Sequence, residues 1–307
     1  MGCLRLTYLV AVKSSMKTPK RIEPLVKEGL VDEVIRQLMS GKEATVYVVR
    51  CGEEIRCAKV YKEANKRAFR QSVDYTEGRR VKNSRQARAM ENGSKFGRKA
   101  QEEAWQNAEI DALYRLAAAG VRVPQPCQFL DGVLLMDLVT DAAGNAAPRL
   151  NDITLEPEQA REFHSLLIAE VVRMLCAGVI HGDLSEYNVL VGSTGPVIID
   201  LPQAVNAAGN NQARRLLERD VNNLAAYFGQ FAPELLQTDY GREIWSLYQS
   251  GKLTVDTALT GRYECDETAP DLTDVMREIR DALDEEAARQ RYRQEMGMTL
   301  PGNKRAD

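Results

Sequence analysis

The sequence predicts an α+β protein with two lobes, a small β-rich N-terminal lobe with one main helix and a mostly helical C-terminal lobe. Two observations support this division. Short β-branched runs dominate the first part of the chain, whereas apolar residues recur at helical spacing in the second part. A buried segment, residues 132–139, is expected to link the lobes, and 307 residues with 44% hydrophobic content are enough for both cores.

The N-terminal lobe is predicted to span residues 31–138. Two β-branched runs, 45–50 and 54–61, flank Cys51-Gly52-Glu53 and indicate a hairpin. A helix is expected from about Gln101 to Ala118, where Gly120 ends it.

The C-terminal lobe is predicted to span residues 139–307. Pro157 begins a long amphipathic helix that ends at Gly178, and strands at 189–191 and 196–200 are joined by a turn at 192–195. A charged helix is expected to include residues 212–220. A C-terminal helix would dock the apolar residues of 272–283.

The charge is unevenly distributed along the chain. Residues 62–99 contain twelve Lys and Arg against four Asp and Glu, a surplus of +8 within a chain whose net charge is -3. Such a basic insert is too polar to bury much apolar surface. It is expected to contact phosphates, RNA or the ribosome.

The cysteines, the apolar runs and the N-terminal residues predict the cellular compartment of the protein. Six cysteines without CxxC or zinc-ligand spacing predict reduced thiols in a cytoplasmic protein. No apolar run reaches the roughly 18 residues of a membrane span, so no membrane contact is expected. Residues 1–30 are interpreted as an N-terminal extension, and residues 1–15 match neither a myristoylation signal nor a cleavable signal peptide.

The stretch HGDLSEYN, residues 181–188, is the strongest chemical signal. It presents Asp183 and, five residues later, Asn188, and the following hairpin is expected to deliver Asp200 to the same place. Phosphoryl transfer needs one carboxylate to orient the attacking hydroxyl, here Asp183, and separate oxygen ligands for Mg²⁺, here Asn188 and Asp200. The spacing matches the H-x-D-x-x-x-x-N loop of kinases. The plain alternative is a solvated polar loop.

Upstream residues predict a nucleotide site. In LMSGKEATV, residues 38–46, Gly41 falls at the second position of a G-x-G-x-x-G-x-V loop, although an ordinary turn is equally compatible. Lys59 falls at the lysine of V-A-I-K and is expected to act with Asp183 and Asp200 in catalysis. Glu109 is its expected partner, with Glu102 and Glu103 as rivals. The residues expected to contact ATP are Ser40, Gly41, Lys42, Val46, Ala58, Lys59, Glu109, Met136, Val139, Asn188, Leu190 and Ile199.

These motifs together resemble the RIO family of atypical protein kinases, nearer its type 1 branch. The resemblance rests on SGKEATVYVV, AKVYK, the basic insert, PRLND, HGDLSEYN and IIDLPQ, and it extends from about Asp32 to Tyr263. It implies a bilobal protein-kinase-like fold, use of ATP with Mg²⁺, and phosphorylation of serine and threonine, including autophosphorylation. It also implies a related ATPase activity, in which Asp200 accepts the phosphoryl group. Eukaryotic and archaeal members of the family act in maturation of the small ribosomal subunit.

The sequence departs from ordinary protein kinases after Asp200. Leu-Pro-Gln follows this aspartate where Phe-Gly is usual, and no A-P-E appears, so no peptide-docking activation segment is expected. The physiological protein substrate is left undefined. The hydroxyls of the insert, at Ser72, Thr76, Ser84 and Ser94, are the expected autophosphorylation sites.

Two other readings remain open at this level. A small-molecule phosphotransferase of the aminoglycoside or choline kinase type shares the HGD loop and the following Ile-Asp. A pseudokinase scaffold would bind RNA or a ribosomal protein through the insert. The SGKEA loop and the basic insert favour RIO over the first, and retention of Lys59, Asp183, Asn188 and Asp200 argues against the second.

Overall fold

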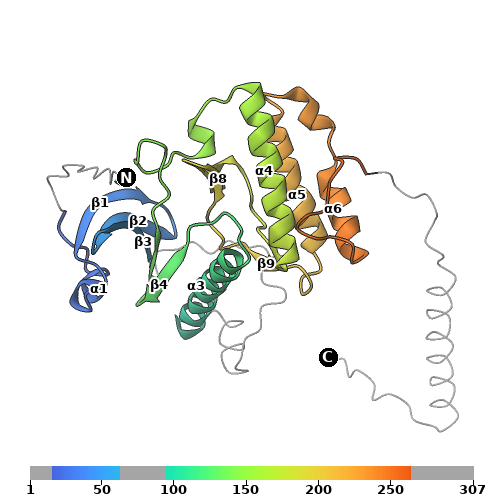
Figure 1. Ribbon diagram of the computed structural model, residues 1–307. Helices are drawn as coiled ribbons and strands as arrows, with labels where there is room; N and C mark the ends of the chain where they lie inside the picture. The colour runs from blue at the N-terminus through green and yellow to red at the C-terminus, as the bar shows by residue number, and fades with distance from the viewer. Residues whose placement is uncertain (1–15, 63–94, 264–307) are drawn as a thin grey trace, which may run out of the picture. The chain divides into compact units, whose positions relative to one another are not determined.

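The computed structural model describes residues 16–62 and 95–263, and for residues 95–105 only the backbone (Figure 1). A sheet and two helices make up the N-terminal part: α1 (Glu23–Lys27), β1 (Glu33–Ser40), β2 (Ala44–Cys51), β3 (Glu54–Tyr61), α3 (Lys95–Ala118), β4 (Pro126–Leu130) and β5 (Val133–Asp137). This is the β-rich lobe with one main helix that the sequence predicts.

The C-terminal part is built on helices. Its elements are η3 (Leu150–Asp152), α4 (Pro157–Cys176), β6 (Val179–Ile180), η4 (Glu186–Asn188), β7 (Val189–Gly192), β8 (Gly195–Ile198), β9 (Val205–Asn206), α5 (Ala213–Phe228), η5 (Pro233–Gln237) and α6 (Tyr240–Gln249). Figure 1 shows α4 and α5 lying side by side, with the short strands β8 and β9 on the side of α4 toward the N-terminal sheet. The chain therefore has the bilobal α+β fold expected from its sequence.

The five strands of the N-terminal sheet are antiparallel and lie in the order β1-β2-β3-β5-β4. The predicted hairpin is present, with Gly52 at its turn in a left-handed conformation. The β4–β5 hairpin turns through Asp131-Gly132, and both residues have positive φ, as a tight two-residue turn requires.

The two faces of this sheet pack into different cores. Ala58, Val60, Val133 and Leu135 form one buried cluster with Leu25 of α1 and its neighbours. Ala44, Tyr61 and Leu134 face the other way and join the large core of α3, α4 and α5. Because side chains alternate across a strand, this division fixes which residues of β3 lie on the same face as Lys59.

Several predicted boundaries differ from the structure. Helix α3 begins at Lys95, so the last five residues of the predicted insert are helical. Strand β5 ends at Asp137 and β8 ends at Ile198, each two residues earlier than predicted. The predicted insert residues 63–94 and the C-terminal helix around 272–283 lie outside the described residues.

Two compositional expectations concern the described residues. All four cysteines described, Cys51, Cys57, Cys127 and Cys176, are free thiols. In the described part of the chain no helix is both long and apolar enough to cross a bilayer.

Candidate active site between the sheet and the helical lobe

An ion-pair chain at Lys59 joins the two lobes. The Lys59 ammonium lies 2.5 Å from Oε1 of Glu109 on α3 and 3.1 Å from Oδ1 of Asp200, which follows β8. The Lys59 and Glu109 side chains are only 12% and 8% exposed, whereas Asp200 is 48% exposed. Of the three rival glutamates, the structure thus places Glu109 beside Lys59.

The charges of this chain stabilise one another. Burial by itself would lower the pKa of the Lys59 ammonium, but the nearby carboxylates, Glu109 first, raise it well above its ordinary value. Burial would raise the pKa of the Asp200 carboxyl, but the Lys59 ammonium lowers it, with smaller contributions from His181 and Arg149. Both groups are therefore charged at neutral pH.

The HGDLSEYN loop is held by side chains on both sides of it. His181 is buried, and its Nε2–H donates to the Ile199 carbonyl at 3.0 Å while Nδ1 accepts from the Asp183 amide. Gly182 has a φ of +80°, a left-handed conformation that suits glycine. Within this frame the Asp183 side chain is exposed.

Asp220 on α5 holds the backbone of the same loop. Its carboxylate accepts the amide hydrogens of Gly182 at 2.7 Å and Leu184 at 3.0 Å, one on each side of Asp183. Burial raises the pKa of the Asp220 carboxyl to about 6, although the two amides lower it. Arg219, the preceding residue, donates to the Gly182 carbonyl.

Asn188 and Asp200 are brought together by the β7–β8 ladder. The Ile199 amide donates to the Asn188 carbonyl at 2.9 Å, so Asn188 lies beside the residue that precedes Asp200. Asn188 uses Nδ2 to donate to the Asp183 carbonyl at 2.8 Å, which leaves its Oδ1 as an acceptor. Asp200 has a φ of +66°, uncommon for a residue other than glycine and frequent at functional sites.

This donor set fits Mg²⁺. Across residues 16–62 and 95–263 no group of three or more His, Cys, Asp and Glu could hold a metal ion alone. One amide oxygen and one carboxylate are instead the usual protein share of a Mg²⁺ site that phosphates and water complete. Oδ1 of Asn188 and Oδ2 of Asp200 are available for that share.

The predicted nucleotide loop is a short turn between β1 and β2. The Gly41 amide donates to the Ala44 carbonyl at 2.9 Å, and Lys42 is exposed at the tip. Lys62, just after β3, donates to Ser40 Oγ at 3.1 Å and to the Gly41 carbonyl at 2.5 Å. A cation therefore ties this turn to the end of β3.

The assignment of Ala58 to the nucleotide pocket is wrong. Ala58 packs in the cluster with Leu25, on the face of β3 opposite to Lys59. Cys57, which precedes Lys59 by two residues and pairs with Met136, lies on the same face of β3 as Lys59. Val46 pairs with Lys59 in the sheet and so remains on the pocket face.

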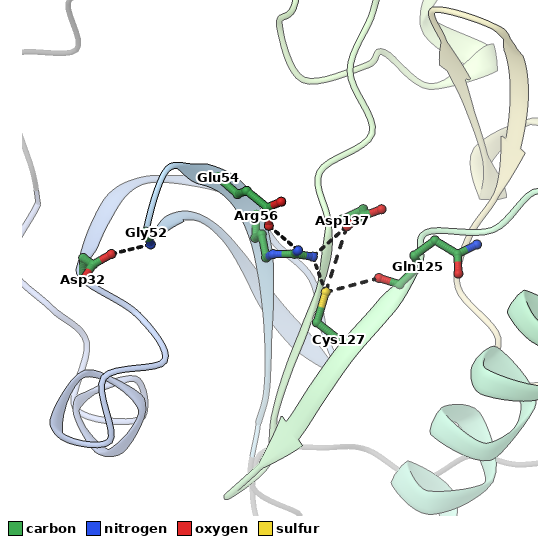
Figure 2. A network of polar contacts seen from close by, with 7 residues as sticks. All are labelled: Asp32, Gly52, Glu54, Arg56, Gln125, Cys127 and Asp137. Carbon is green, nitrogen blue, oxygen red and sulfur yellow. Dashed lines mark hydrogen bonds and ion pairs between the residues drawn. The ribbon is translucent and has the colours of Figure 1, made fainter.

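The link between the lobes is fixed by a polar network on its outer side. Figure 2 shows the Arg56 guanidinium in contact with Glu54, Asp137 and Cys127. Arg56 and Asp137 are also direct partners in the β3–β5 register, and Cys127 comes from β4. The end of β5 is thereby tied to both neighbouring strands just before the chain enters the second lobe.

Beyond β5 the chain offers backbone groups to a ligand. The Val139 carbonyl accepts the Ala147 amide at 2.9 Å, whereas the Val139 amide donates to no partner within the described residues. Leu190 on β7 and Ile199 after β8 are partly buried. The structure gives no contact that joins Lys42, Leu190 or Val139 directly to Asp183.

Sequence reasoning missed several residues of the site. In the sequence Asp220 ends the predicted charged helix, although an aspartate in an otherwise apolar helical face is a signal of a buried acceptor. The sequence alone does not single out Cys57, because both faces of β3 are apolar. Arg149 lies within the PRLND motif, which by itself assigns it no role.

The chain has a β-sheet lobe and a helical lobe joined by a short linker. A lysine–glutamate pair and an H-x-D-x-x-x-x-N loop meet between the two lobes. Together these features define a protein-kinase-like phosphotransferase fold. The comparisons with known proteins narrow this class. A family model described as the RIO domain matches residues 45–240, more than half of the chain. The chain therefore belongs to the RIO domain family, and the resemblance found in its motifs is confirmed.

Relatives from archaea and eukaryotes agree with this assignment. The chain is 36% identical over 210 residues to the RIO-type serine/threonine-protein kinase Rio1 of Haloferax volcanii, covering 67% of each chain. It is 31% identical to serine/threonine-protein kinase rio1 of Schizosaccharomyces pombe, over 66% of this chain and 40% of the relative. It is 26% identical to human serine/threonine-protein kinase RIO1, over 87% of this chain and 45% of the relative. The chain thus spans less than half the length of these two eukaryotic relatives.

Proposed function

We propose that this chain is a RIO-type protein kinase that transfers the γ-phosphoryl group of ATP to serine or threonine hydroxyls. The observation that carries the proposal is the Lys59 ammonium, held between Glu109 at 2.5 Å and Asp200 at 3.1 Å. A buried cation fixed in this way is suited to bind the α- and β-phosphates. The naming of its relatives as serine/threonine-protein kinases supports the choice of acceptor.

Asp183 is proposed to position the acceptor. Its exposed carboxylate would accept a hydrogen bond from the attacking hydroxyl and take the proton as the oxygen bonds to the γ-phosphorus and ADP leaves. Asp220 and His181 support this role, because they hold the backbone on both sides of Asp183. A fixed loop keeps the carboxylate in place without any change of conformation at the moment of transfer.

Asn188 and Asp200 are proposed to hold Mg²⁺ through Oδ1 and Oδ2. When bound there, Mg²⁺ would neutralise part of the phosphate charge and stabilise the charge that develops during transfer. The adenine base would lie against Val46, Cys57, Met136, Leu190 and Ile199, and the Val139 amide would donate to it. A mostly apolar pocket with one or two fixed donors is the usual form of such a site.

The segment between Asp200 and α5 is short. Only residues 201–212 lie between Asp200 and α5, which supports the expectation that no peptide-docking activation segment is present. Autophosphorylation within residues 62–99, and contact of this basic segment with RNA or a ribosome, remain proposals that rest on its composition.

A second candidate activity is ATP hydrolysis through an aspartyl phosphate. The side chain of Asp200 is 48% exposed and Lys59 engages only Oδ1. In this activity Oδ2 would act as the nucleophile instead of as a metal ligand. It would attack the γ-phosphorus, ADP would leave, and water would then hydrolyse the acyl phosphate. Trapping with hydroxylamine tests this path, and phosphate found only on serine or threonine would exclude it.

The experiment that tests the main proposal compares acceptors. Radiolabelled ATP is incubated with the protein alone, with a model protein and with an aminoglycoside, each with the wild type and Asp183→Asn. We expect label on protein hydroxyls that Asp183→Asn reduces by about a hundredfold or more, with MgATP affinity changed little, because this carboxylate is not a metal ligand. Label on the aminoglycoside alone, or an equal loss of MgATP binding in the variant, would refute the proposal.

A further inference from the structure

Arg149 occupies a fixed position beside the floor of the candidate nucleotide site. It pairs with Leu190 in an isolated β-bridge, and the preceding Pro148 carbonyl accepts the Val191 amide at 2.8 Å. Its backbone is extended just before η3, with a φ of -72° and a ψ of 153°. The base of this side chain is therefore attached to the strand that follows Asn188.

The guanidinium of Arg149 crosses to the opposite lobe. Its Nη2 lies 3.2 Å from Sδ of Met39, next to the predicted nucleotide loop on β1. A thioether is a weak acceptor for a charged donor. No carboxylate lies within ion-pair distance of Arg149 in the part of the chain that the structure describes.

The electrostatic environment also indicates an anion at this position. Leu190, the β-bridge partner of Arg149, lies two residues after Asn188, so Arg149 lies beside the proposed metal and phosphate groups. Lys59, Glu109, Asp183 and Asp200 together carry one positive and three negative charges. ATP brings four more negative charges, which one Mg²⁺ and Lys59 alone do not offset.

We infer that Arg149 binds a phosphate oxygen of the nucleotide from the helical lobe, opposite Lys59 of the sheet. The inference rests on the proposed function, since it concerns the nucleotide of that same site. The planar fork of arginine is suited to two oxygens of one phosphate, and a phosphate is a much stronger acceptor than the Met39 sulfur. Nucleotide binding would thus exchange the Met39 contact for a charged hydrogen bond.

Calorimetric titration with ATP, ADP and adenosine, each with Mg²⁺, tests the assignment. We expect Arg149→Ala to weaken ATP binding by about ten- to a hundredfold and to leave adenosine binding unchanged. Arg149→Lys should show a smaller loss for ATP, because it keeps the charge without the fork. Arg161→Ala is the matched control, since its guanidinium pairs with Glu234 in the helical lobe.

The outcomes separate this inference from the proposed function. A wild-type protein that binds neither ATP nor ADP would overturn the proposed function itself. Normal ATP binding in the wild type with no change in Arg149→Ala, or an equal loss for adenosine, would overturn only the role of Arg149. Met39→Leu removes the sulfur acceptor of Arg149. If this variant lost as much ATP affinity as Arg149→Ala, the loss in Arg149→Ala would come from the contact between the lobes and not from a bond to phosphate. Thermal unfolding of each variant confirms that the fold is intact.

Discussion

The Lys59 ammonium lies 2.5 Å from the Glu109 carboxylate, in a pair that connects β3 with α3 and is almost fully buried. A buried charge is costly unless its partner is in place, so the pair positions α3 against the sheet as well as the ammonium against the nucleotide. Lys59 also reaches Asp200 at 3.1 Å. One side chain thereby couples the sheet, the main helix of the same lobe and the metal position of the other lobe.

Glu109→Gln is expected to weaken both function and stability. The variant leaves the Lys59 ammonium with Asp200 as its remaining carboxylate, so kcat/KM for ATP should fall about tenfold or more and the free energy of unfolding by about 1–3 kcal/mol. Steady-state kinetics and urea denaturation measure the two effects. Asp111→Asn, an exposed position on the same helix, is the control and should change neither. Wild-type kinetics in Glu109→Gln would contradict a role of the pair in nucleotide binding.

Asp200→Asn is expected to change the requirement for Mg²⁺. The amide keeps one oxygen but removes the charge that binds the metal, so the Mg²⁺ concentration for half-maximal activity should rise about tenfold or more. The variant also removes the carboxylate that engages Lys59 at 3.1 Å. Activity measured against Mg²⁺ at saturating ATP gives the result. The same Mg²⁺ requirement in the variant and the wild type would exclude Asp200 as a ligand.

Local patterns in the sequence were sufficient to predict the architecture and to name the candidate site residues. The alternation of β2 and β3, the apolar face of α4 and the spacing of Asp183 and Asn188 are all properties of short segments, so they can be read without knowledge of the fold. The structure places Glu109, which is buried on α3, beside Lys59.

Features that depend on packing between distant segments were not predictable in the same way. Strands β1 and β4 have weak alternation and are recognised only by their pairing at the two edges of the sheet. The error at Ala58 arose because the two faces of β3 are both apolar, so composition does not reveal which one faces the ligand. Asp220 is 37 residues after Asp183, and only the tertiary fold brings its carboxylate under the loop.

Asp220→Asn is expected to loosen the loop and to change how stability depends on pH. An amide can accept from only one of the Gly182 and Leu184 amides and presents a donor to the other, so turnover at pH 7.5 should fall about tenfold. Because the folded-state pKa of about 6 is above the ordinary value of 3.8, the wild type gains stability from this group at low pH and loses it as pH rises through 6. Between pH 5 and 7.5 the variant should therefore gain about 1.5 kcal/mol relative to the wild type. A difference that does not vary with pH, measured by urea denaturation, would contradict the raised pKa.

His164→Leu is expected to show the opposite dependence on pH. His164 on α4 is buried against the rings of Phe228 and Tyr240, each with centroids 5.7 Å away, and its Nε2 has no hydrogen-bond partner in the described residues. Burial lowers the pKa of this imidazole from 6.5 to about 4, so the group is held neutral in the folded protein and binds a proton only after unfolding.

The wild type should consequently lose stability as pH falls below 6.5, and the loss from this one group amounts to about 2 kcal/mol between pH 7.5 and 5. His164→Leu removes the titration and keeps an apolar side chain of similar size, so its free energy of unfolding should rise relative to the wild type by that amount at pH 5. The free energy of unfolding therefore changes with pH in the opposite direction for His164 and for Asp220. Because the two groups titrate in the same pH range, their contributions offset each other in the wild type. Urea denaturation of both variants and of the double variant at pH 5 and 7.5 tests this cancellation. A His164→Leu protein with the same pH dependence as the wild type would show that the pKa of His164 does not differ between the folded and unfolded states, and would contradict the lowered pKa.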